Sequence, residues 1–304
     1  MSKILVTGGK GAVGTYLVKE LQSRDHDVFV ADRAHANEDN YFRCDISQYR
    51  QVERVLEEGQ FDYVYNLAAE FGRWNGEDFY ENLWASNAIG TKHVIRMQEK
   101  LGFNLVHFSS SEVYGDYDGD MSEDVMDKYE IRQMNDYALT KWVNEQQIMN
   151  SADMFDTKSV RVRLFNTYGP GEYYSNYRSV ICLFVYRALH GLPYTVYQGH
   201  TRTSTYITDM ANTLSNIVDN FKPGEVYNIA GTDYHTVEDV SETIWKVLGK
   251  APQNVTLGGA EPYTTKDKKV TITKAIEDLK HNPKVALDEG IANTVAWMKS
   301  VYNV

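Results

Sequence analysis

A glycine-rich segment near the amino terminus limits the possible folds of this chain more than any other part. It reads Thr7-Gly8-Gly9-Lys10-Gly11-Ala12-Val13-Gly14 and follows a short apolar run at 3–7. Gly9, Gly11 and Gly14 have the spacing G-x-G-x-x-G, and apolar residues recur at helical spacing over 12–22. Such glycines allow a tight turn, a close approach to a pyrophosphate, and packing of the helix on the strand. The free N–H groups at the helix start favour anions. The segment therefore predicts a dinucleotide-binding loop.

An acidic residue follows at the distance expected for such a site. Asp32 lies about 20 residues after the last glycine, at the end of a predicted strand over 27–31. A carboxylate there accepts hydrogen bonds from ribose hydroxyls and repels a 2′-phosphate, so NAD is predicted rather than NADP. Arg33 beside it weakens this preference. A nucleoside-triphosphate P-loop is not expected, because no Gly-Lys-Ser/Thr follows the glycines.

Strand-like and helix-like segments alternate through the first 120 residues. Strands are predicted at 3–7, 27–31, 63–67 and 104–109, and helices at 12–22, 47–58 and 77–101. This alternation predicts an α/β fold with a Rossmann-type, doubly wound parallel sheet. After Tyr168 the regular alternation of strand-like and helix-like segments ends. We expect residues 1–168, with return segments near 203–230, to form a NAD-binding domain, and residues 169–304 mainly a smaller, interleaved substrate-binding lobe.

Composition excludes several classes of function. The 304 residues include 31 Lys and Arg and 42 Asp and Glu, a formal net charge of −11, which disfavours nucleic acids and anionic membrane surfaces. Cys44 and Cys182 are too few for a disulfide scaffold or a cysteine-based zinc site. No histidine pair has a metal-binding spacing. No signal-peptide core or apolar stretch of about 20 residues occurs, so we expect a cytoplasmic protein without a metal.

Two further motifs suggest proton transfer. Tyr137 and Lys141 lie at i and i+4 of a predicted helix. Because the reference pKa of tyrosine is about 10, a nearby cation is needed to make the phenol a base near neutral pH. The strand over 104–109 ends in Ser109-Ser110-Ser111-Glu112-Val113-Tyr114-Gly115. Hydroxyls at that end can hold a sugar hydroxyl while the tyrosine takes its proton.

Together the three motifs resemble the extended short-chain dehydrogenase/reductase family, in particular its nucleotide-sugar epimerases and dehydratases. The resemblance implies a tightly bound, recycled NAD, contacts of Asp45 and Ile46 with adenine, and a strand end at Leu67, Ala68 and Ala69 over the cofactor. The full predicted cofactor set is Gly8, Gly11, Ala12, Val13, Gly14, Asp32, Arg33, Asp45, Ile46, Leu67, Ala68, Ala69, Tyr137 and Lys141.

For the substrate, the resemblance implies a nucleotide-diphosphate sugar. Asn166 and Arg202 match family positions that bind its phosphates, and Arg178 is a second cation suited to them. The helices around 87–97 and 137–148 resemble the family's dimer interface, so a homodimer is expected. No nucleic-acid or membrane partner is expected.

The family chemistry begins with transient oxidation of sugar C4, with Tyr137 removing the hydroxyl proton. The triplet Ser110-Ser111-Glu112 favours a 4,6-dehydratase, in which Glu112 removes the C5 proton, Ser110 holds the C4 oxygen and Ser111 stands at the position of the acid. A 4-epimerase is the first alternative. UDP-glucuronate decarboxylases share the Ser-Glu pair but use a late arginine where this chain has Lys268. From a different class, a non-catalytic NAD-sensing protein would not need Tyr137 or Lys141.

Overall fold

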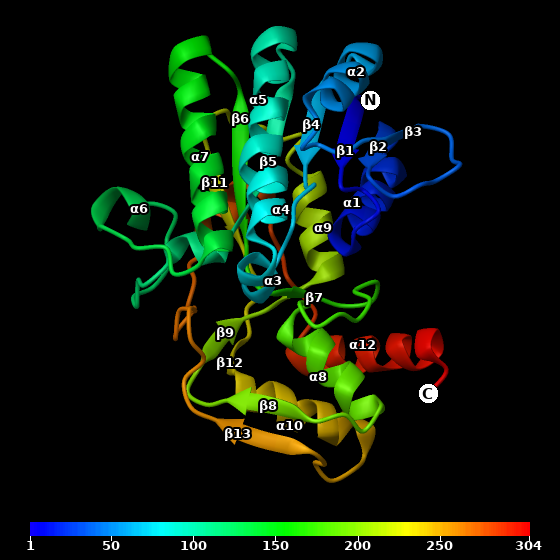
Figure 1. Cartoon of the computed structure of the whole chain (residues 1–304), viewed down its shortest axis with the longest axis vertical. Coiled ribbons are helices and arrows are strands. Elements are labelled where there is room, and N and C mark those ends of the chain that lie inside the picture. Colours follow the sequence, from blue (N-terminus) through cyan, green and yellow to red (C-terminus); the bar gives the residue numbers. More distant parts are fainter.

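A seven-stranded parallel sheet forms the centre of the computed structural model, which describes all residues 1–304 (Figure 1). Its strand order is β11-β6-β5-β4-β1-β2-β3. The strands are β1 (Lys3–Thr7), β2 (Asp27–Asp32), β3 (Tyr41–Arg43), β4 (Tyr63–Asn66), β5 (Asn104–Ser110), β6 (Ser159–Leu164) and β11 (Val226–Ile229). The order reverses between β1 and β4, which opens a crevice at their carboxyl ends. The predicted doubly wound α/β fold is confirmed.

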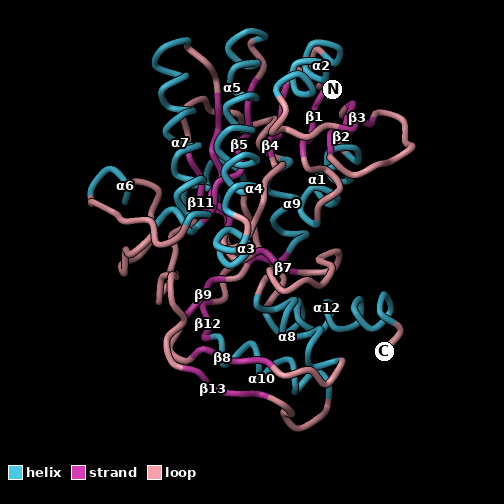
Figure 2. The backbone as a smooth tube through the Cα atoms, in the orientation of Figure 1, coloured by secondary structure: helices cyan, strands magenta, loops and turns pink.

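Helices cover both faces of this sheet (Figure 2). One face carries α1 (Ala12–Ser23) and α9 (Ile207–Ser215), and the other α2 (Tyr49–Gly59), α5 (Gly90–Leu101) and α7 (Asp136–Phe155). The alternation within β1 explains the two layers, since Ile4 packs in the α1/α9 core and Leu5 in the opposite core. Successive side chains of a strand point to opposite faces, so a strand buried on both faces reads as an unbroken apolar run.

The single helix expected over 77–101 is wrong in its first half. The chain instead forms α3 (Arg73–Asp78), α4 (Tyr80–Trp84), a π-helical turn η1 (Ala85–Ile89) and then α5. The turn places Asn87 in the interior, where its side chain accepts from Glu70 N (2.8 Å) and donates to Glu70 O (3.0 Å). Asn87 thereby holds the segment after β4. The short strand β3 was also not expected.

A smaller lobe lies beyond the carboxyl edge of the sheet (Figure 1). It contains α8 (Val180–Leu189), α10 (Val237–Leu248), α12 (Leu287–Tyr302) and the paired strands β8 (Tyr194–Tyr197) and β13 (Val255–Gly258). These elements share their own apolar cluster, which includes Val185, Ile244 and Met298. Two short pairs join the lobe to the sheet: β7 (Thr167–Tyr168) with β10 (Thr205–Tyr206), and β9 (Thr201–Thr203) with β12 (Tyr234–Thr236).

The chain crosses between sheet and lobe more often than expected. Besides the return through α9 and β11, helix α11 (Thr273–Leu279) packs on β11 and buries Ala275 and Leu279 in the core on the α1/α9 side. The remaining helix, α6 (Val125–Lys128), lies in the loop after β5. The division at residue 168 stays a prediction. None of the helices combines the length and the apolar character needed to cross a membrane.

Candidate active site

A cavity of about 810 Å³ lies between the carboxyl edge of the sheet and the lobe. Every residue predicted for cofactor, substrate or catalysis lines this one cavity. They come from segments far apart in the chain, since the glycine loop follows β1, Ser110 ends β5, Tyr137 lies on α7 and Arg202 on β9. The structure brings the predicted set together, and the role of each member stays a prediction.

The glycine loop is shaped by two close backbone approaches. Gly8 has φ +69°, and a Cβ there would lie 2.8 Å from Ala68 N. A Cβ on Gly14 would lie 2.4 Å from Gly8 O. Gly11 precedes α1, and no side chain caps the free N–H groups at that helix start. The cradle fits a dinucleotide pyrophosphate, which those N–H groups would bind. Gly9, used in the spacing argument, instead packs against the Val30 side chain.

The adenosine end is fixed by backbone contacts. The Asp32 carboxylate accepts from Lys10 N (3.0 Å) and Ala34 N (3.1 Å), which fixes its position at the end of β2. Arg33 extends to Glu70, with Nη1 2.7 Å from Oε1, and its side chain is exposed. Thr7 Oγ1 accepts from Ala68 N (3.2 Å) and so holds the 67–69 segment against the loop.

Asp45 and Ile46 follow β3 and line the same cavity. Asp45 N donates to Gln51 Oε1 (2.8 Å), and its carboxylate accepts from Ser47 N (2.9 Å). Ile46 packs against Gly90 on α5, where a Cβ would lie 2.8 Å from its Cγ1. The residues around the cavity therefore fit NAD along its adenosine and pyrophosphate.

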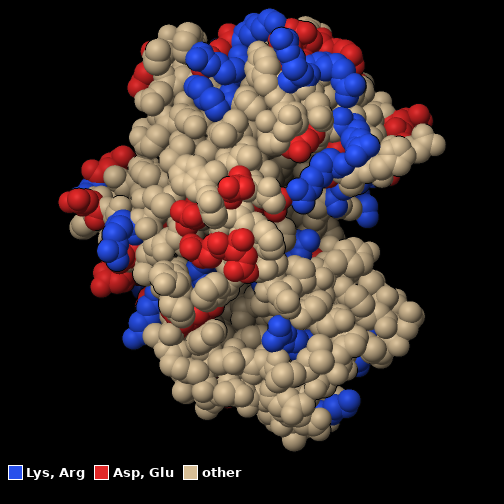
Figure 3. Space-filling model, viewed as in Figure 1, with Lys and Arg blue, Asp and Glu red and all other residues tan.

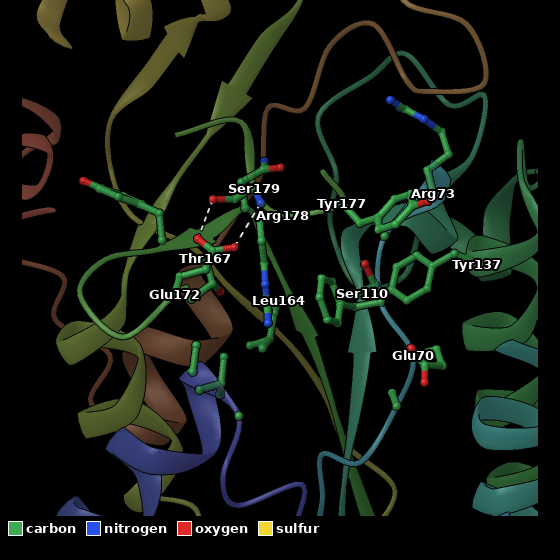
Figure 4. A pocket seen from close by; sticks show the side chains of 18 of the residues that line it. Glu70, Arg73, Ser110, Tyr137, Leu164, Thr167, Glu172, Tyr177, Arg178 and Ser179 are labelled. Carbon is green, nitrogen blue, oxygen red and sulfur yellow. Dashed lines mark hydrogen bonds between the residues drawn. The ribbon is translucent and has the colours of Figure 1, made fainter. Parts of the chain in front are cut away.

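Ser110, Tyr137 and Lys141 all line the cavity, and Figure 4 shows Ser110 beside Tyr137. Helix α7 begins at Asn135, whose side chain accepts from Ala138 N (2.8 Å), and this places Tyr137 in its first turn beside Ser110. Lys141 Nζ lies 5.8 Å from the centre of the Tyr137 ring and donates to Phe108 O (2.8 Å). The geometry allows the phenol to take a proton from a hydroxyl held by Ser110.

The protonation of this pair differs from the sequence-based expectation. Burial raises the pKa of Tyr137 to about 12, and its contact with Ser110 opposes that rise. Burial also lowers the pKa of Lys141 to about 8, although Glu145 raises it. Burial of Tyr137 therefore sets the direction of its pKa in the protein without cofactor or substrate, and its role as a base stays a prediction.

Glu112 is paired with a lysine that lies distant in the sequence. It belongs to the turn η2 (Ser111–Tyr114), which follows β5, and its Oε1 accepts from Lys268 Nζ. Lys268 is almost fully buried, and its Nζ also lies 3.5 Å from Ser111 Oγ. Burial raises the pKa of Glu112, but Lys268, with help from Arg73 and Arg202, outweighs burial and lowers it to about 2.

The two partners of this ion pair respond differently. The pKa of Lys268 is lowered, first by burial and further by Arg202 and Arg73, although Glu112 raises it. Glu112 faces three cations, whereas Lys268 faces one carboxylate and two other cations. The directions of the two shifts indicate that Glu112 is ionised in this pair, whereas Lys268 is disfavoured as a cation by burial and by its cationic neighbours.

The predicted substrate residues occupy the lobe side. Arg202 is buried, and its Nη1 donates to Thr201 O (2.7 Å) and Lys266 O (3.1 Å). Asn166 Nδ2 donates to Thr203 O (3.1 Å). Arg178 projects into the cavity, stacks 4.2 Å from the Phe71 ring centre and leaves its Nε without a partner (Figure 4). These cations suit a diphosphate.

Sequence reasoning missed several residues at this site. Arg73 and Glu261 line the cavity and form an ion pair between α3 and the lobe. Glu172 is buried and accepts from Ser179 N (2.9 Å) and Oγ (2.6 Å), and burial raises its pKa. The sequence indicates Arg73 only through the segment 70–78, which contains Phe71, Arg73 and Trp74, departs from the family pattern and is predicted to shape specificity. In the tyrosine-rich loop, Tyr174 stacks on Tyr186 inside the lobe, whereas Tyr177 lines the cavity.

Comparison with known proteins agrees with this arrangement. Residues 4–230 match the model of the NAD dependent epimerase/dehydratase family. A UDP-N-acetyl-alpha-D-glucosaminuronate decarboxylase of Bacillus cytotoxicus is 26% identical, over 99% of both chains. UDP-glucuronic acid decarboxylase 6 of Arabidopsis thaliana is 29% identical, over 95% of this chain and 86% of the relative. A dTDP-glucose 4,6-dehydratase of Salmonella typhimurium also matches, at 24% identity over 97% of this chain and 92% of the relative.

The fold likewise has solved counterparts. The UDP-glucose 4-epimerase of Thermus thermophilus, solved with NAD, superposes with a TM-score of 0.87 at 25% identity and covers 98% of this chain and 99% of that one. The relatives thus include decarboxylases, a dehydratase and an epimerase. The family and the NAD dependence predicted from the glycine loop, Asp32 and the Tyr-Lys pair are confirmed, and the protein belongs to the NAD-dependent epimerase/dehydratase family.

Proposed function

We propose that this protein is a nucleotide-sugar decarboxylase that removes the carboxyl group of a nucleoside-diphosphate uronic acid through transient oxidation at C4. The ion pair between Lys268 and Glu112 is the observation that carries this proposal. It revises the order of the alternatives, because the sequence analysis favoured a 4,6-dehydratase and regarded Lys268 as a weak replacement for an arginine.

The state of Glu112 argues against the role of C5 base. A carboxylate whose pKa is held at about 2 is a weak proton acceptor, since a general base works best with a pKa near the operating pH. The dehydratase mechanism needs such a base at C5. Decarboxylation does not, so a permanently ionised, paired Glu112 is compatible with it.

The bond changes in decarboxylation are simple. Oxidation at C4 gives a ketone that is β to the C6 carboxylate. The bond between C5 and C6 then breaks, its electrons pass through C4 to the ketone oxygen as an enolate, and carbon dioxide leaves. A proton is added at C5, and the ketone is reduced again. Cations near the carboxylate would hold it in the orientation required for this cleavage.

The chain's own residues have separate tasks in this scheme. NAD, when bound, supplies the acceptor for the C4 hydride and its return. Tyr137 takes the C4 hydroxyl proton and later returns it to the same oxygen, which Ser110 holds by a hydrogen bond. Lys141 places a positive charge beside the phenol and favours its ionised form. Arg73 and Arg202 line the cavity near Glu112, and Lys268 pairs with Glu112 from behind the cavity wall.

The 4,6-dehydratase remains a second candidate, because Ser110, Ser111 and Glu112 all line the cavity and a dehydratase is among the relatives. It requires Glu112 to separate from Lys268 when substrate binds. A 4-epimerase would use Tyr137 and Ser110 alone and leaves the buried ion pair without a function.

The experiment is mass spectrometry of the protein incubated with NAD and, in turn, UDP-glucuronate, UDP-N-acetylglucosaminuronate, UDP-glucose and dTDP-glucose. We expect the uronates to lose carbon dioxide and the neutral sugars to remain unchanged. Loss of water from a neutral sugar would establish the dehydratase instead. A new isomer of unchanged mass would establish the epimerase.

We further propose that the protein is a cytoplasmic homodimer. Ile89, Leu139 and Met149 are exposed apolar side chains on η1 and α7, and Figure 3 shows an uncharged surface over the middle of α5 and α7. Sedimentation velocity of the wild type and of Leu139→Glu tests this: a dimer that dissociates in the variant is expected, whereas a monomeric wild type contradicts it.

A further inference from the structure

Arg73 is the cavity-lining arginine that pairs with a carboxylate through only one nitrogen of its Nε/Nη2 edge. Its Nη2 donates to Glu261 Oε1, but its Nε is buried and has no partner. Nε and Nη2 form one edge of the guanidinium, and a carboxylate usually occupies such an edge with two parallel hydrogen bonds. Glu261 uses only half of it. The site is therefore built for a carboxylate in a position that Glu261 does not reach.

The anchoring of Glu261 suggests how it could be replaced. Its backbone N donates to Nε2 of the buried His200 (2.8 Å), so the main chain is held by a contact that does not use the carboxylate. Asn135 Nδ2 also donates to Tyr263 O (3.1 Å), and Trp74 packs edge-on against the Tyr263 ring. The lobe segment is thus fixed against α3 and α7 by contacts that do not involve the Glu261 carboxylate.

Three cations lie together at this end of the cavity. Arg73, Arg202 and Lys268 all act on Glu112, and Arg202 is also acted on by Glu261 and Asp267. Lys268 is paired with Glu112, and Arg202 lies on the side assigned to the diphosphate. Arg73 is the cation left to bind a sugar substituent. Figure 4 shows Arg73 on the same side of the cavity as Tyr137, with its guanidinium extending away from Tyr137 and Ser110.

We infer that Arg73 is the residue that recognises the acid group of the sugar, and that Glu261 occupies it as an internal substitute until a sugar carboxylate takes its place. This rests on the proposed function for the substrate class. A neutral sugar would leave the Arg73–Glu261 pair intact, so Arg73 would add nothing to its binding affinity. The exchange thereby converts a contact between α3 and the lobe into a selectivity for uronic acids.

The test is equilibrium binding, measured by calorimetry in the presence of NAD and in a Tyr137→Phe background to prevent turnover. The ligands are UDP-glucuronate and its neutral counterpart UDP-glucose, and the variants are Arg73→Gln, Arg73→Lys and Glu261→Gln. We expect Arg73→Gln to reduce the preference for UDP-glucuronate about 10- to 100-fold, the range for a lost hydrogen bond to a charged group. The preference of Arg73→Lys for UDP-glucuronate should lie between those of the Arg73 protein and Arg73→Gln, because lysine keeps the positive charge but cannot form two parallel hydrogen bonds with a carboxylate.

Glu261→Gln gives the decisive readout. Removing the Glu261 carboxylate, which competes for Arg73, should strengthen the binding of UDP-glucuronate and leave the affinity for UDP-glucose unchanged. A purely structural ion pair would not produce this gain in affinity. The inference is overturned if Arg73→Gln weakens both ligands equally, if the starting protein binds both alike, or if Glu261→Gln does not strengthen UDP-glucuronate binding.

These measurements are independent of carbon dioxide release. A clear preference for UDP-glucuronate without decarboxylation would contradict the proposed reaction and leave the role of Arg73 standing. Decarboxylation with an unchanged preference in Arg73→Gln would contradict the role of Arg73 alone.

Discussion

The cofactor side and the sugar side of the cavity are built by different means. The cofactor side consists mainly of backbone: the glycine loop, the start of α1 and the ends of β2 and β4, which follow one another within a short stretch of chain. The sugar side consists of long charged side chains, and its ion pairs join residues as distant as Arg73 to Glu261 and Glu112 to Lys268. Local spacing specifies the first, whereas only the tertiary fold assembles the second.

This contrast is tested most strongly at Tyr137, which belongs to both sides. Tyr137→Phe removes the phenolic oxygen that exchanges a proton with the C4 oxygen, so turnover should fall about 10²- to 10⁴-fold. NAD affinity should change little, because the pyrophosphate and adenosine contacts remain. Steady-state kinetics and NAD binding measure the two quantities. Full activity in this variant would remove the basis for assigning any proton transfer to Tyr137.

The ion pair of the sugar side is tested by Lys268→Met, with the neighbouring Lys269→Met as the matched control. Lys269 is exposed and bonds only Asp120. We expect Lys268→Met to lower kcat/KM for a uronate about 10- to 100-fold, because a charge-assisted contact is lost, and Lys269→Met to be neutral. If Glu112 were instead the C5 base of a dehydratase, loss of Lys268 would raise its basicity, and the release of water from a neutral nucleotide sugar would be preserved in Lys268→Met.

The pH dependence of stability follows the same pair. The pKa of Glu112 is lowered from its ordinary 4.5 to about 2 on folding, so its stabilising contribution is present above pH 4.5 and is lost as pH falls toward 2. In Lys268→Met this acid-dependent loss should disappear or reverse, because burial then raises the pKa of Glu112, and a carboxyl whose pKa is raised on folding stabilises the fold at low pH. Thermal unfolding between pH 2 and pH 6 measures this pH dependence, and Glu112→Gln should abolish it.

The backbone character of the cofactor side predicts a smaller but selective effect at Gly8. Gly8→Ala and Gly249→Ala both place a side chain at a positive φ, +69° and +66°, which costs about 1–2 kcal/mol. Only at Gly8 does the new Cβ meet another segment, at Ala68 N. Gly8→Ala should therefore unfold at lower temperature than Gly249→Ala and alone weaken NAD binding. Equal effects would show that the contact with the 67–69 segment is unimportant.

What the sequence could predict follows the same division. The alternating apolar runs predicted the sheet, and the glycines, Asp32, Tyr137 and Lys141 predicted the cofactor, because all of these depend on local spacing. The failure at 77–101 arose because a tertiary contact, Asn87 with the Glu70 backbone, determines the π-helical turn. The spacing of Tyr137 and Lys141 predicted that they lie on one face of a helix, but it could not show that both are buried, and burial raises the pKa of Tyr137.

Lys268 shows the same limitation at the site itself. The sequence shows Lys268 at the position of the family's late arginine, but it could not predict the ion pair with Glu112. That contact, and the approach to Ser111, depends on how the segment around Lys268 folds back onto η2. Arg73 and Glu261 had no motif at all. Specificity on the sugar side is therefore readable only once the fold has placed these charges together.

The central claim, that this cavity binds and decarboxylates a uronic acid, is tested most directly with UDP-glucuronate and UDP-N-acetylglucosaminuronate isotopically labelled at C6. Incubation with the protein and NAD, followed by NMR, should show the label leaving a sugar as carbon dioxide and bicarbonate, with a pentose nucleotide as the other product. Retention of the label in the sugar nucleotide with both uronates, together with loss of water from a neutral hexose nucleotide, would contradict the claim and restore Glu112 as a C5 base.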